Sequence, residues 1–475
     1  MLEDLKEKTK EIEMDHEENG AEENKLGVMP VGKLFVSLAA PAIAAQLINL
    51  LYNVVDRIYI GHIPEIGSAA LTGVGVTFPV LMLISAFAAL VGFGGAPRAA
   101  ICMGRGEKDA AEEILGNCVS MLLIVAAILT VVFSIWGKPI LYAFGASDET
   151  ITYASRYLSV YVLGTVCVQL TTGLNSFITS QGFASTAMKT VMIGAGLNLV
   201  LDPIFIFGFG MGVQGAALAT ILSQAVSAVW VVGFLRGKKT ILHIRLRNMK
   251  IRLRVLGPVL ALGISPFIMQ STESLLSVCF NTSLLKYGGD IAVGSMTILS
   301  SVMSAALMPI QGMSQGMQPI VSFNYGAKNM IRVRKAFTIA LRACLIYTTA
   351  LWALAMLFPG VLARIFTPDQ ELIDYCVWAI RIYMGATCVF GAQIACQQTF
   401  VALGKAVHSL FLAILRKIIL LIPLIYILPM FFEDKVFAVF LAEPISDFIA
   451  VATTVTLFSL TAWKMMKDKT EKVAK

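Results

Sequence analysis

The chain has 475 residues, of which 57% are hydrophobic and 14% are charged, and its mean hydropathy is +0.78. Soluble domains carry about a quarter charged residues, so this composition excludes an ordinary soluble protein and predicts a polytopic membrane protein. The eight cysteines are scattered without a CxxC pair, which disfavours metal or redox chemistry, and the net charge of +7 comes largely from loops, which disfavours nucleic-acid binding.

The first segment, residues 1–32, is rich in Glu, Asp and Lys and has no apolar core, so we expect a disordered acidic cytoplasmic tail and no signal peptide. About twelve apolar segments follow, and each is long enough to be a transmembrane helix. They cover residues 34–61, 69–97, 113–136, 151–176, 187–208, 213–235, 257–285, 291–318, 336–358, 372–402, 407–430 and 435–462.

Lysine and arginine gather on one side of these spans. They cluster around residues 98–108, in the segment 236–256 and around residues 328–335, whereas the opposite loops hold few basic residues. Loops rich in Lys and Arg stay in the cytoplasm. We therefore expect a cell (inner or plasma) membrane protein with both termini in the cytoplasm.

The chain repeats internally. The basic cytoplasmic linker, residues 236–256, separates an N-lobe over 33–235 from a C-lobe over 257–462, and a basic tail follows over 463–475. LAAP at 38–41 corresponds to LGISP at 262–266, and GRGEKD at 104–109 corresponds to NYGAKN at 324–329. With six spans in each half the repeat is parallel. We predict an all-α polytopic protein of two six-helix bundles related by a pseudo-two-fold axis, with a substrate site between them.

The fifth span carries Asn198 and Asp202, followed at once by Pro203. Residues four apart share one face of a helix. A carboxylate near the middle of a membrane helix costs roughly 3 kcal/mol or more, so such groups usually line an ion pathway. Thr220, at the start of the next span, could add a hydroxyl ligand for a small cation. A helix-end Asp at the membrane surface is the alternative interpretation.

Other polar residues lie in the first and seventh spans. Asp56 aligns with Asn281 of the other half, and Asp202 aligns with Ile422, so acids at these two positions occur only in the first half. Gln46 and Asn49 lie below Asp56 and could line a substrate path or hydrogen bond between helices. Several methionines of spans seven and eight, among them Met269 and Met303, could contact substrates of varied shape or simply pack.

These motifs, in this order, resemble the multidrug and toxic compound extrusion (MATE) transporters, particularly the bacterial MepA and DinF branch. The resemblance rests on LYNVVDRIYIG at 51–61, GRGEKDAAE at 104–112, NLVLDPIFIFGFGMGVQGAALAT at 198–220, NYGAKN and LRKIILLIPLIYIL at 415–428. It implies a secondary antiporter that exports cationic amphipathic drugs in exchange for protons or sodium ions.

The resemblance also implies site residues. It assigns a cation-coupling site to Asp56, Asn198, Asp202 and Thr220, with Tyr157 beside them, and these four residues would be the metal ligands if sodium is the coupling ion. It further points to Glu273 as a substrate contact. The stretch 383–403 of span ten has no acid, which argues against a cation site in the C-lobe.

A desolvated carboxylate favours its protonated form, so Asp56 or Asp202 could bind a proton, and the ion and the drug would then antagonise each other's binding. No cofactor is expected beyond the coupling ion, and no nucleotide, because the GxGxxG at 210–215 lacks the acid that a dinucleotide site needs. Membrane lipid is the other expected partner. A flippase for a lipid-linked or other amphipathic substrate is the alternative, and an enzyme is disfavoured because no catalytic cluster is evident. The choice between proton and sodium, the physiological substrate and the oligomeric state stay open.

Overall fold

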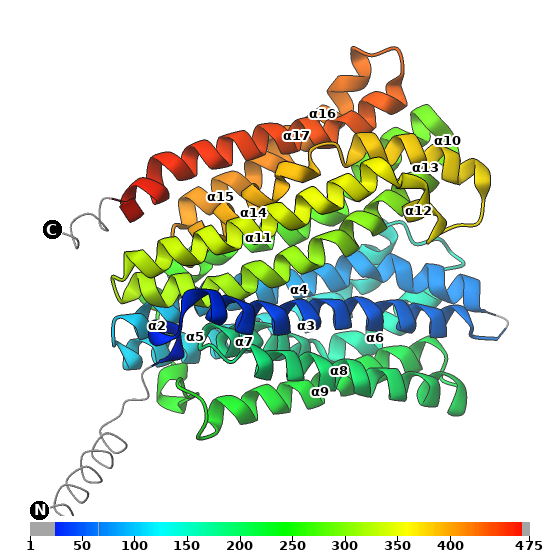
Figure 1. The fold of residues 1–475 in the computed structure, drawn as a ribbon. Coiled ribbons are helices and arrows are strands. Elements are labelled where there is room, and N and C mark those ends of the chain that lie inside the picture. Colours follow the sequence, from blue (N-terminus) through cyan, green and yellow to red (C-terminus); the bar gives the residue numbers. More distant parts are fainter. Residues whose placement is uncertain (1–23, 65, 468–475) are drawn as a thin grey trace, which may run out of the picture.

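The computed structural model describes residues 24–64 and 66–467, and all of its regular elements are helices (Figure 1). In chain order they are α2 (Lys25–Val28), α3 (Val31–Gly61), α4 (Gly67–Gly104), α5 (Lys108–Ala143), α6 (Ile151–Leu163), α7 (Thr165–Ser180), α8 (Ala184–Pro203), η1 (Ile204–Gly208), α9 (Val213–Arg236), η2 (Leu246–Met249), α10 (Leu253–Gly326), α11 (Met330–Leu357), α12 (Pro359–Arg364), α13 (Gln370–Tyr383), α14 (Thr387–Ala402), α15 (Ala406–Ile414), η3 (Leu415–Leu421), α16 (Ile422–Ile427), η4 (Leu428–Met430), α17 (Lys435–Phe458) and η5 (Ser459–Trp463).

The described chain contains twelve segments that are long and apolar enough to span a membrane. Nine of its helices are long and apolar enough to span a membrane, and two bent helix pairs act as two more spans. The twelfth comes from α10, which consists of two helices joined at Gly289, where φ is 67°. A left-handed φ is cheap only for glycine, so Gly289 permits the reversal. The predicted all-α architecture is confirmed.

Two predicted spans are broken rather than continuous. The span 151–176 is a pair, α6 and α7, bent by 60° at Gly164, and the span 372–402 is a pair, α13 and α14, bent by 50°. The two breaks follow Tyr161 and Tyr383, which are matched positions of the repeat. The pseudo-symmetry therefore extends to the places where helices bend.

The turns at 104–109 and 324–329 also match, but with a shift. Gly106 and Lys328 have left-handed φ angles of 79° and 59°. Glu107 N donates to Cys102 O, and Asn329 N donates to Asn324 O, both at 2.9 Å. The structure thus pairs residue 106 with residue 328, two residues away from the alignment of the two motifs by sequence.

The lobes meet through glycines. A Cβ on Gly104 of α4 would overlap the Phe323 carbonyl of α10, and a Cβ on Gly326 would overlap the Ile101 carbonyl of α4. A Cβ on Gly316 would lie 2.6 Å from Ala39 of α3. Small residues allow membrane helices to approach this closely. These contacts lie in the half of the molecule that holds both chain ends, and they close the lobes against each other there (Figure 1).

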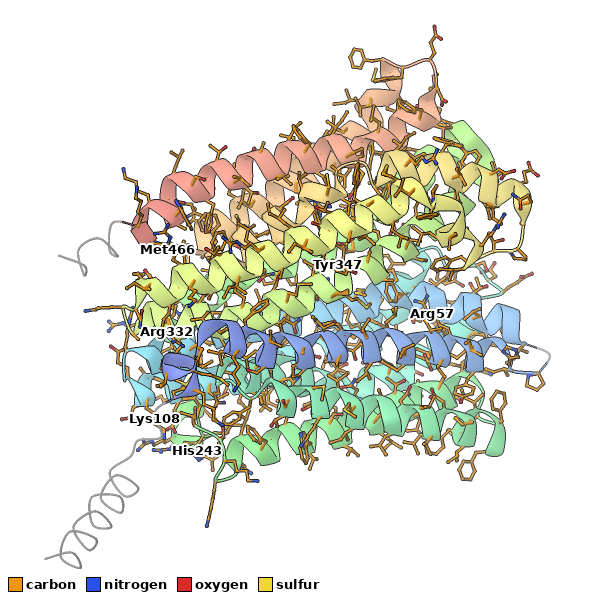
Figure 2. The ribbon with its side chains drawn as sticks, viewed as in Figure 1. Arg57, Lys108, His243, Arg332, Tyr347 and Met466 are labelled. Atoms are coloured by element: carbon orange, nitrogen blue, oxygen red, sulfur yellow. The ribbon has the colours of Figure 1, made fainter. Side chains whose placement is uncertain are left out.

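The linker is a folded segment of the N-lobe surface. The Gln181 side-chain oxygen accepts hydrogen bonds from the backbone N–H groups of Ile241 and Leu242, both at 2.8 Å. Glu112, which is fully buried, pairs with Arg245 at 2.8 Å. Lys108, His243, Arg332 and Met466 lie near the chain ends, while Arg57 lies toward the other end (Figure 2).

The predicted disordered tail over 1–32 is too long, because its last residues are helical. In α2, Leu26 is fully buried. Asn324 and Arg332 of the C-lobe donate to Leu26 O at 2.9 and 3.1 Å, and Arg332 also donates to Met29 O at 2.6 Å. Residues 1–23 lie outside the described part, as do residues 468–475 of the predicted basic tail, which is helical up to residue 467.

Candidate ion-coupling and substrate site

Two acids of the N-lobe meet inside the membrane-spanning bundle. Asp56 comes from α3 and Asp202 from α8, and their carboxyl groups lie against each other, close enough to share a proton. Asp202 is fully buried. Asp56 Oδ1 and Asp202 Oδ2 are buried without a hydrogen-bond donor among the described residues. Arg57 lies over the Phe78 ring at 5.5 Å, and no ion pair between Asp56 and Arg57 occurs in the described chain.

Neutral polar groups surround the acid pair. Asn198 Nδ2 donates to Asp202 Oδ1 at 3.1 Å and lies 3.4 Å from Thr220 Oγ1, which itself donates to Ala216 O at 3.0 Å. Tyr157 is buried, and its hydroxyl lies beside Thr220. The structure therefore brings together all five residues that the resemblance assigns to the coupling site.

The backbone is irregular at this point. Pro203 ends α8, and the five residues of η1 that follow form a π-helix. Proline cannot donate the helical N–H, and π-turns often occur at functional sites. Asp202 therefore lies at the end of regular helix, where the main chain is easiest to rearrange.

A cavity of about 200 Å³ lies next to the acid pair, between N-lobe helices and the second half of α10. Its wall includes Gln46, Asn49, Tyr52, Asn198 and Thr220. The C-lobe closes it with the residues Gln315, Gln318, Pro319 and Ser322. The lining is rich in amides and hydroxyls and contains no ionised side chain. Asp202 lies one helical turn beyond Asn198 on α8, and Asp56 lies one turn beyond Tyr52 on α3, so both acids sit just outside the lining.

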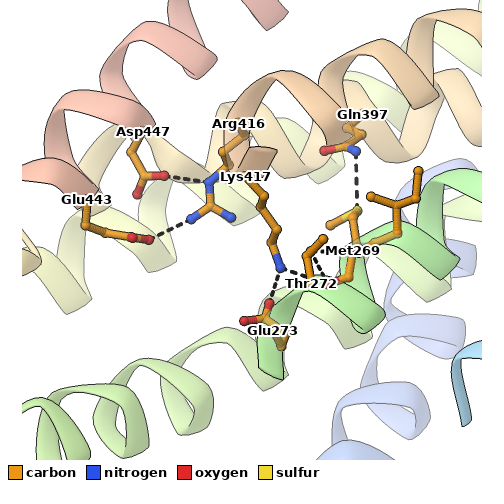
Figure 3. Close-up of polar contacts among 9 residues, drawn as sticks. Met269, Thr272, Glu273, Gln397, Arg416, Lys417, Glu443 and Asp447 are labelled. Carbon is orange, nitrogen blue, oxygen red and sulfur yellow. Dashed lines mark hydrogen bonds and ion pairs between the residues drawn. The ribbon is translucent and has the colours of Figure 1, made fainter. Parts of the chain in front are cut away.

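The C-lobe acids are arranged differently (Figure 3). Arg416 Nε donates to Asp447 at 2.6 Å, and Arg416 Nη2 donates to Glu443 at 3.0 Å. Lys417 Nζ donates to Met269 O at 2.8 Å and pairs with Glu273. Each of these three C-lobe carboxylates therefore has a cationic partner.

The other predicted substrate contacts lie apart from the cavity. Met269 is half-buried, and its sulfur accepts from Gln397 Nε2 at 3.3 Å. Met303 is buried in the C-lobe core. Glu273 has a 62% exposed side chain on α10. The substrate roles of these three residues stay predictions, and the position of Met303 favours packing.

Sequence reasoning did not assign a role to Tyr52, which lines the cavity and lies near both acids. Its position four residues before Asp56 on the same helix face was a usable signal. The pairing of Arg416 and Lys417 with three acids from two other helices was also missed, since sequence spacing does not show contacts between distant segments.

Comparisons with known proteins agree with this architecture. The family model of MatE matches residues 41–204 and 266–427, one segment in each lobe. The multidrug export protein MepA of Staphylococcus haemolyticus is 22% identical over 421 residues, which cover 88% of this chain and 92% of that protein. A FAD transporter of Shewanella oneidensis is 24% identical over 88% of this chain and 92% of that protein.

Solved structures share the fold. An outward-facing structure of a multidrug resistance MATE family transporter of the MOP superfamily has a TM-score of 0.87 and 25% identity, with 95% of this chain and 99% of that chain covered. A MOP superfamily transporter from Pyrococcus furiosus, whose binding pocket is described as having reverse polarity, gives the same TM-score and identity over 94% and 99%. The family match spans more than half of the sequence, so this chain belongs to the MatE family of multi-pass membrane transporters and is not an enzyme.

Proposed function

We propose that this transporter is a secondary antiporter that exports cationic amphipathic small molecules in exchange for protons or sodium ions, by alternating access. The observation that carries the proposal is the pair of the half-buried Asp56 and the fully buried Asp202, which forms no ion pair with a cationic side chain among the described residues, Arg57 being the nearby cation that acts on Asp56 only through space. Two carboxylates in contact inside a low-dielectric bundle cannot both stay ionised without a bound cation or proton. The pair must therefore take up a positive charge from solution.

Coupling follows from the position of the pair. Asn198 and Thr220 contact the acid cluster on one side and line the cavity on the other. A proton or sodium ion on the acids reduces the negative potential in the cavity, so it weakens the binding of an organic cation there. The ion and the cationic substrate then exclude each other, which is the linkage that antiport requires.

The choice of ion depends on one amide. Asn198 turns its Nδ2 group toward Asp202 and Thr220. A sodium ion needs oxygen ligands, so sodium binding by Asp56, Asn198, Asp202 and Thr220 would require this amide to turn and present its oxygen. A proton shared by the acids needs no such change.

Orientation supports export. We place the chain in the cell membrane with both termini in the cytoplasm, because the basic linker and the basic turns lie at the end that holds both termini (Figure 2). The lobes touch at that end, so the arrangement corresponds to a transporter closed toward the cytoplasm.

The test is uptake of ethidium by inverted vesicles that contain the parent or the Asp202→Asn variant, under an imposed proton or sodium gradient. We expect one gradient to drive uptake by the parent and the variant to lose it. Uptake that is equal in the variant would remove Asp202 from coupling. A parent that transports no cation under either gradient would refute the proposal.

A second candidate is transport of an amphipathic anion, such as a flavin nucleotide or a lipid-linked substrate. The relative named a FAD transporter and the two C-lobe cations favour it. Both cations are already paired with acids, which leaves little positive charge for a phosphate. Uptake of FAD in the same vesicles, with no uptake of ethidium, would select this alternative.

A further inference from the structure

Two consecutive cations of the C-lobe, Arg416 and Lys417, face different helices. Arg416 and Lys417 both lie in the π-helical segment η3, and neighbouring residues of a helix project about 100° apart. Arg416 faces α17, where Glu443 and Asp447 occupy one face, and its guanidinium lies over the Phe390 ring at 4.5 Å. Arg416 is fully occupied by these partners.

Lys417 faces α10 instead (Figure 3). Its side chain is 4% exposed, and its ammonium donates to Met269 O and to Glu273 Oε1, which lie one turn apart on the same helix. The carboxylate of this pair is the accessible partner, because the Glu273 side chain is 62% exposed. The buried Lys417 ammonium thus contacts the protein-facing oxygen of Glu273, while the rest of the carboxylate is exposed.

The exposed side of Glu273 belongs to a polar stripe. Glu273, Ser277 and Asn281 are all exposed and follow one another at four-residue intervals along the first half of α10. The stripe ends at Leu285, which is exposed and apolar, and Leu275 and Val278 are exposed on the adjacent face of the same helix. A stripe with a carboxylate is unstable against lipid chains, so it faces the aqueous space of the transport path, while the apolar face meets lipid.

We propose that Lys417 is a tethered counter-ion that sets how strongly Glu273 attracts a cationic substrate. This inference rests on the proposed export of organic cations. A cation that arrives from the aqueous side meets a carboxylate whose other oxygen already holds an ammonium. Lys417 therefore lowers the affinity for cations, and it makes Glu273 selective for cations that also donate a hydrogen bond to the remaining oxygen, Oε2.

This arrangement has a functional use. An exporter must release its cargo, and an exposed carboxylate without a partner would hold a cation tightly. The Lys417 ammonium stays on Glu273 Oε1 while the cargo binds and leaves at Oε2, so Glu273 is never left with its full charge uncompensated. Specificity-determining residues of this kind act by opposing one ligand as much as by favouring another.

The test is equilibrium binding of tetraphenylphosphonium, a cation without hydrogen-bond donors, to the full chain in lipid nanodiscs. We expect Lys417→Met, which keeps the side-chain volume, to lower the Kd by about tenfold, and Lys417→Arg to leave it near the parent value. Glu273→Gln should weaken binding, and the double variant with Lys417→Met and Glu273→Gln should match Glu273→Gln alone. Lys417→Gln, which keeps a donor for Met269 O, serves if Lys417→Met does not fold.

Three results would overturn the inference. One is a Kd for the folded Lys417→Met or Lys417→Gln variant that is unchanged or higher. Another is a gain in affinity that persists when Glu273 is Gln. The third is binding of flavin mononucleotide to the parent that Lys417→Met abolishes, which would make Lys417 an anion site. A parent that binds no tetraphenylphosphonium would refute the proposed function itself, whereas a parent that binds it with no effect of Lys417 refutes the inference alone.

Discussion

The two lobes bury acids within the same fold but balance them differently. In the N-lobe, Asp56 and Asp202 lie beside each other, an amide and hydroxyls, and neither forms an ion pair among the described residues, although Arg57 acts on Asp56 through space. In the C-lobe, Glu443 and Asp447 are bridged by Arg416. A buried acid with a fixed cationic partner is a structural charge, whereas one without a partner must exchange ions with solution. The difference in partners, more than the acids themselves, distinguishes a coupling site from a structural contact.

The backbone irregularities of the lobes differ in a related way. In the N-lobe the π-helical turn η1 follows Pro203, while in the C-lobe η3 precedes Pro423. The first irregularity lies next to an acid, and the second presents Arg416 and Lys417. Both lobes thus have six spans with matching bends. Their π-helical segments differ, because η1 lies beside an acid and η3 carries two basic residues.

The largest expected effect concerns the C-lobe bridge. Arg416→Met should lower the free energy of unfolding by about 3–5 kcal/mol, because it leaves two buried carboxylates uncompensated. Thermal unfolding in detergent measures it. The triple variant that adds Glu443→Gln and Asp447→Asn should recover most of the loss, and an unchanged melting temperature for Arg416→Met alone would contradict a structural role.

The opposite outcome is expected in the N-lobe. Asp56→Asn should leave the melting temperature at or above that of the parent, because it removes an unbalanced buried charge, and should lower gradient-driven transport by about 100-fold, or about 2.7 kcal/mol. Ethidium uptake together with thermal unfolding separates the two effects. A variant that unfolds early and transports normally would reverse the comparison between the lobes.

A third prediction concerns a place where the lobes are equivalent. Gly104→Ala and Gly326→Ala should each destabilise the contact between α4 and α10 by about 1–3 kcal/mol, because the new methyl group overlaps a backbone carbonyl. Gly233→Ala on α9 is the matched control, since a Cβ there meets nothing within 4 Å. Unequal losses of stability at Gly104 and Gly326 would show that the contact between α4 and α10 is energetically asymmetric, although its geometry is symmetric.

The smallest effect is expected at the edge of the coupling site. Tyr157→Phe removes the hydroxyl beside Thr220 and should cost about 1 kcal/mol, or about fivefold in transport rate. Tyr153→Phe, on the same helix, is the control and should behave as the parent. Initial rates of ethidium uptake measure both, and a loss as large as that of Asp56→Asn would make Tyr157 a primary member of the site.

Much of this arrangement could be predicted from the sequence. Hydropathy gave the spans, and the spacing of Asn198 and Asp202 indicated a shared helix face, as found. Thr220 was suggested by its place at the start of the next span and Asp56 by the asymmetry of the repeat, but only the family resemblance joined them with Tyr157 into one site, because no local pattern joins residues of separate helices. The breaks after Tyr161 and Tyr383 were missed, since the two halves of each bent pair together are as long and apolar as one membrane span.

The ion-pair partners of the C-lobe charges could not be predicted for a different reason. Arg416 and Lys417 are adjacent, yet their partners come from α17 and α10, and only the through-space arrangement decides whether a membrane-buried cation is free or paired. The docking of α2 was missed similarly, because a short segment after an acidic run carries no periodicity to reveal a buried Leu26.

The N-terminal helix α2 has a consequence for the timing of the transport cycle. Its chain continues directly into α3 of the N-lobe, but its carbonyls are held by Asn324 and Arg332 of the C-lobe. Under the proposed alternating access, separation of the lobes at this end would break these hydrogen bonds in every turnover and form them again on return. Since the recognised groups are main-chain carbonyls, side-chain changes in this segment leave the bonds intact. In that cycle Arg332 slows the separation of the lobes. Loss of its hydrogen bonds to α2 would speed this step without changing any contact with the substrate.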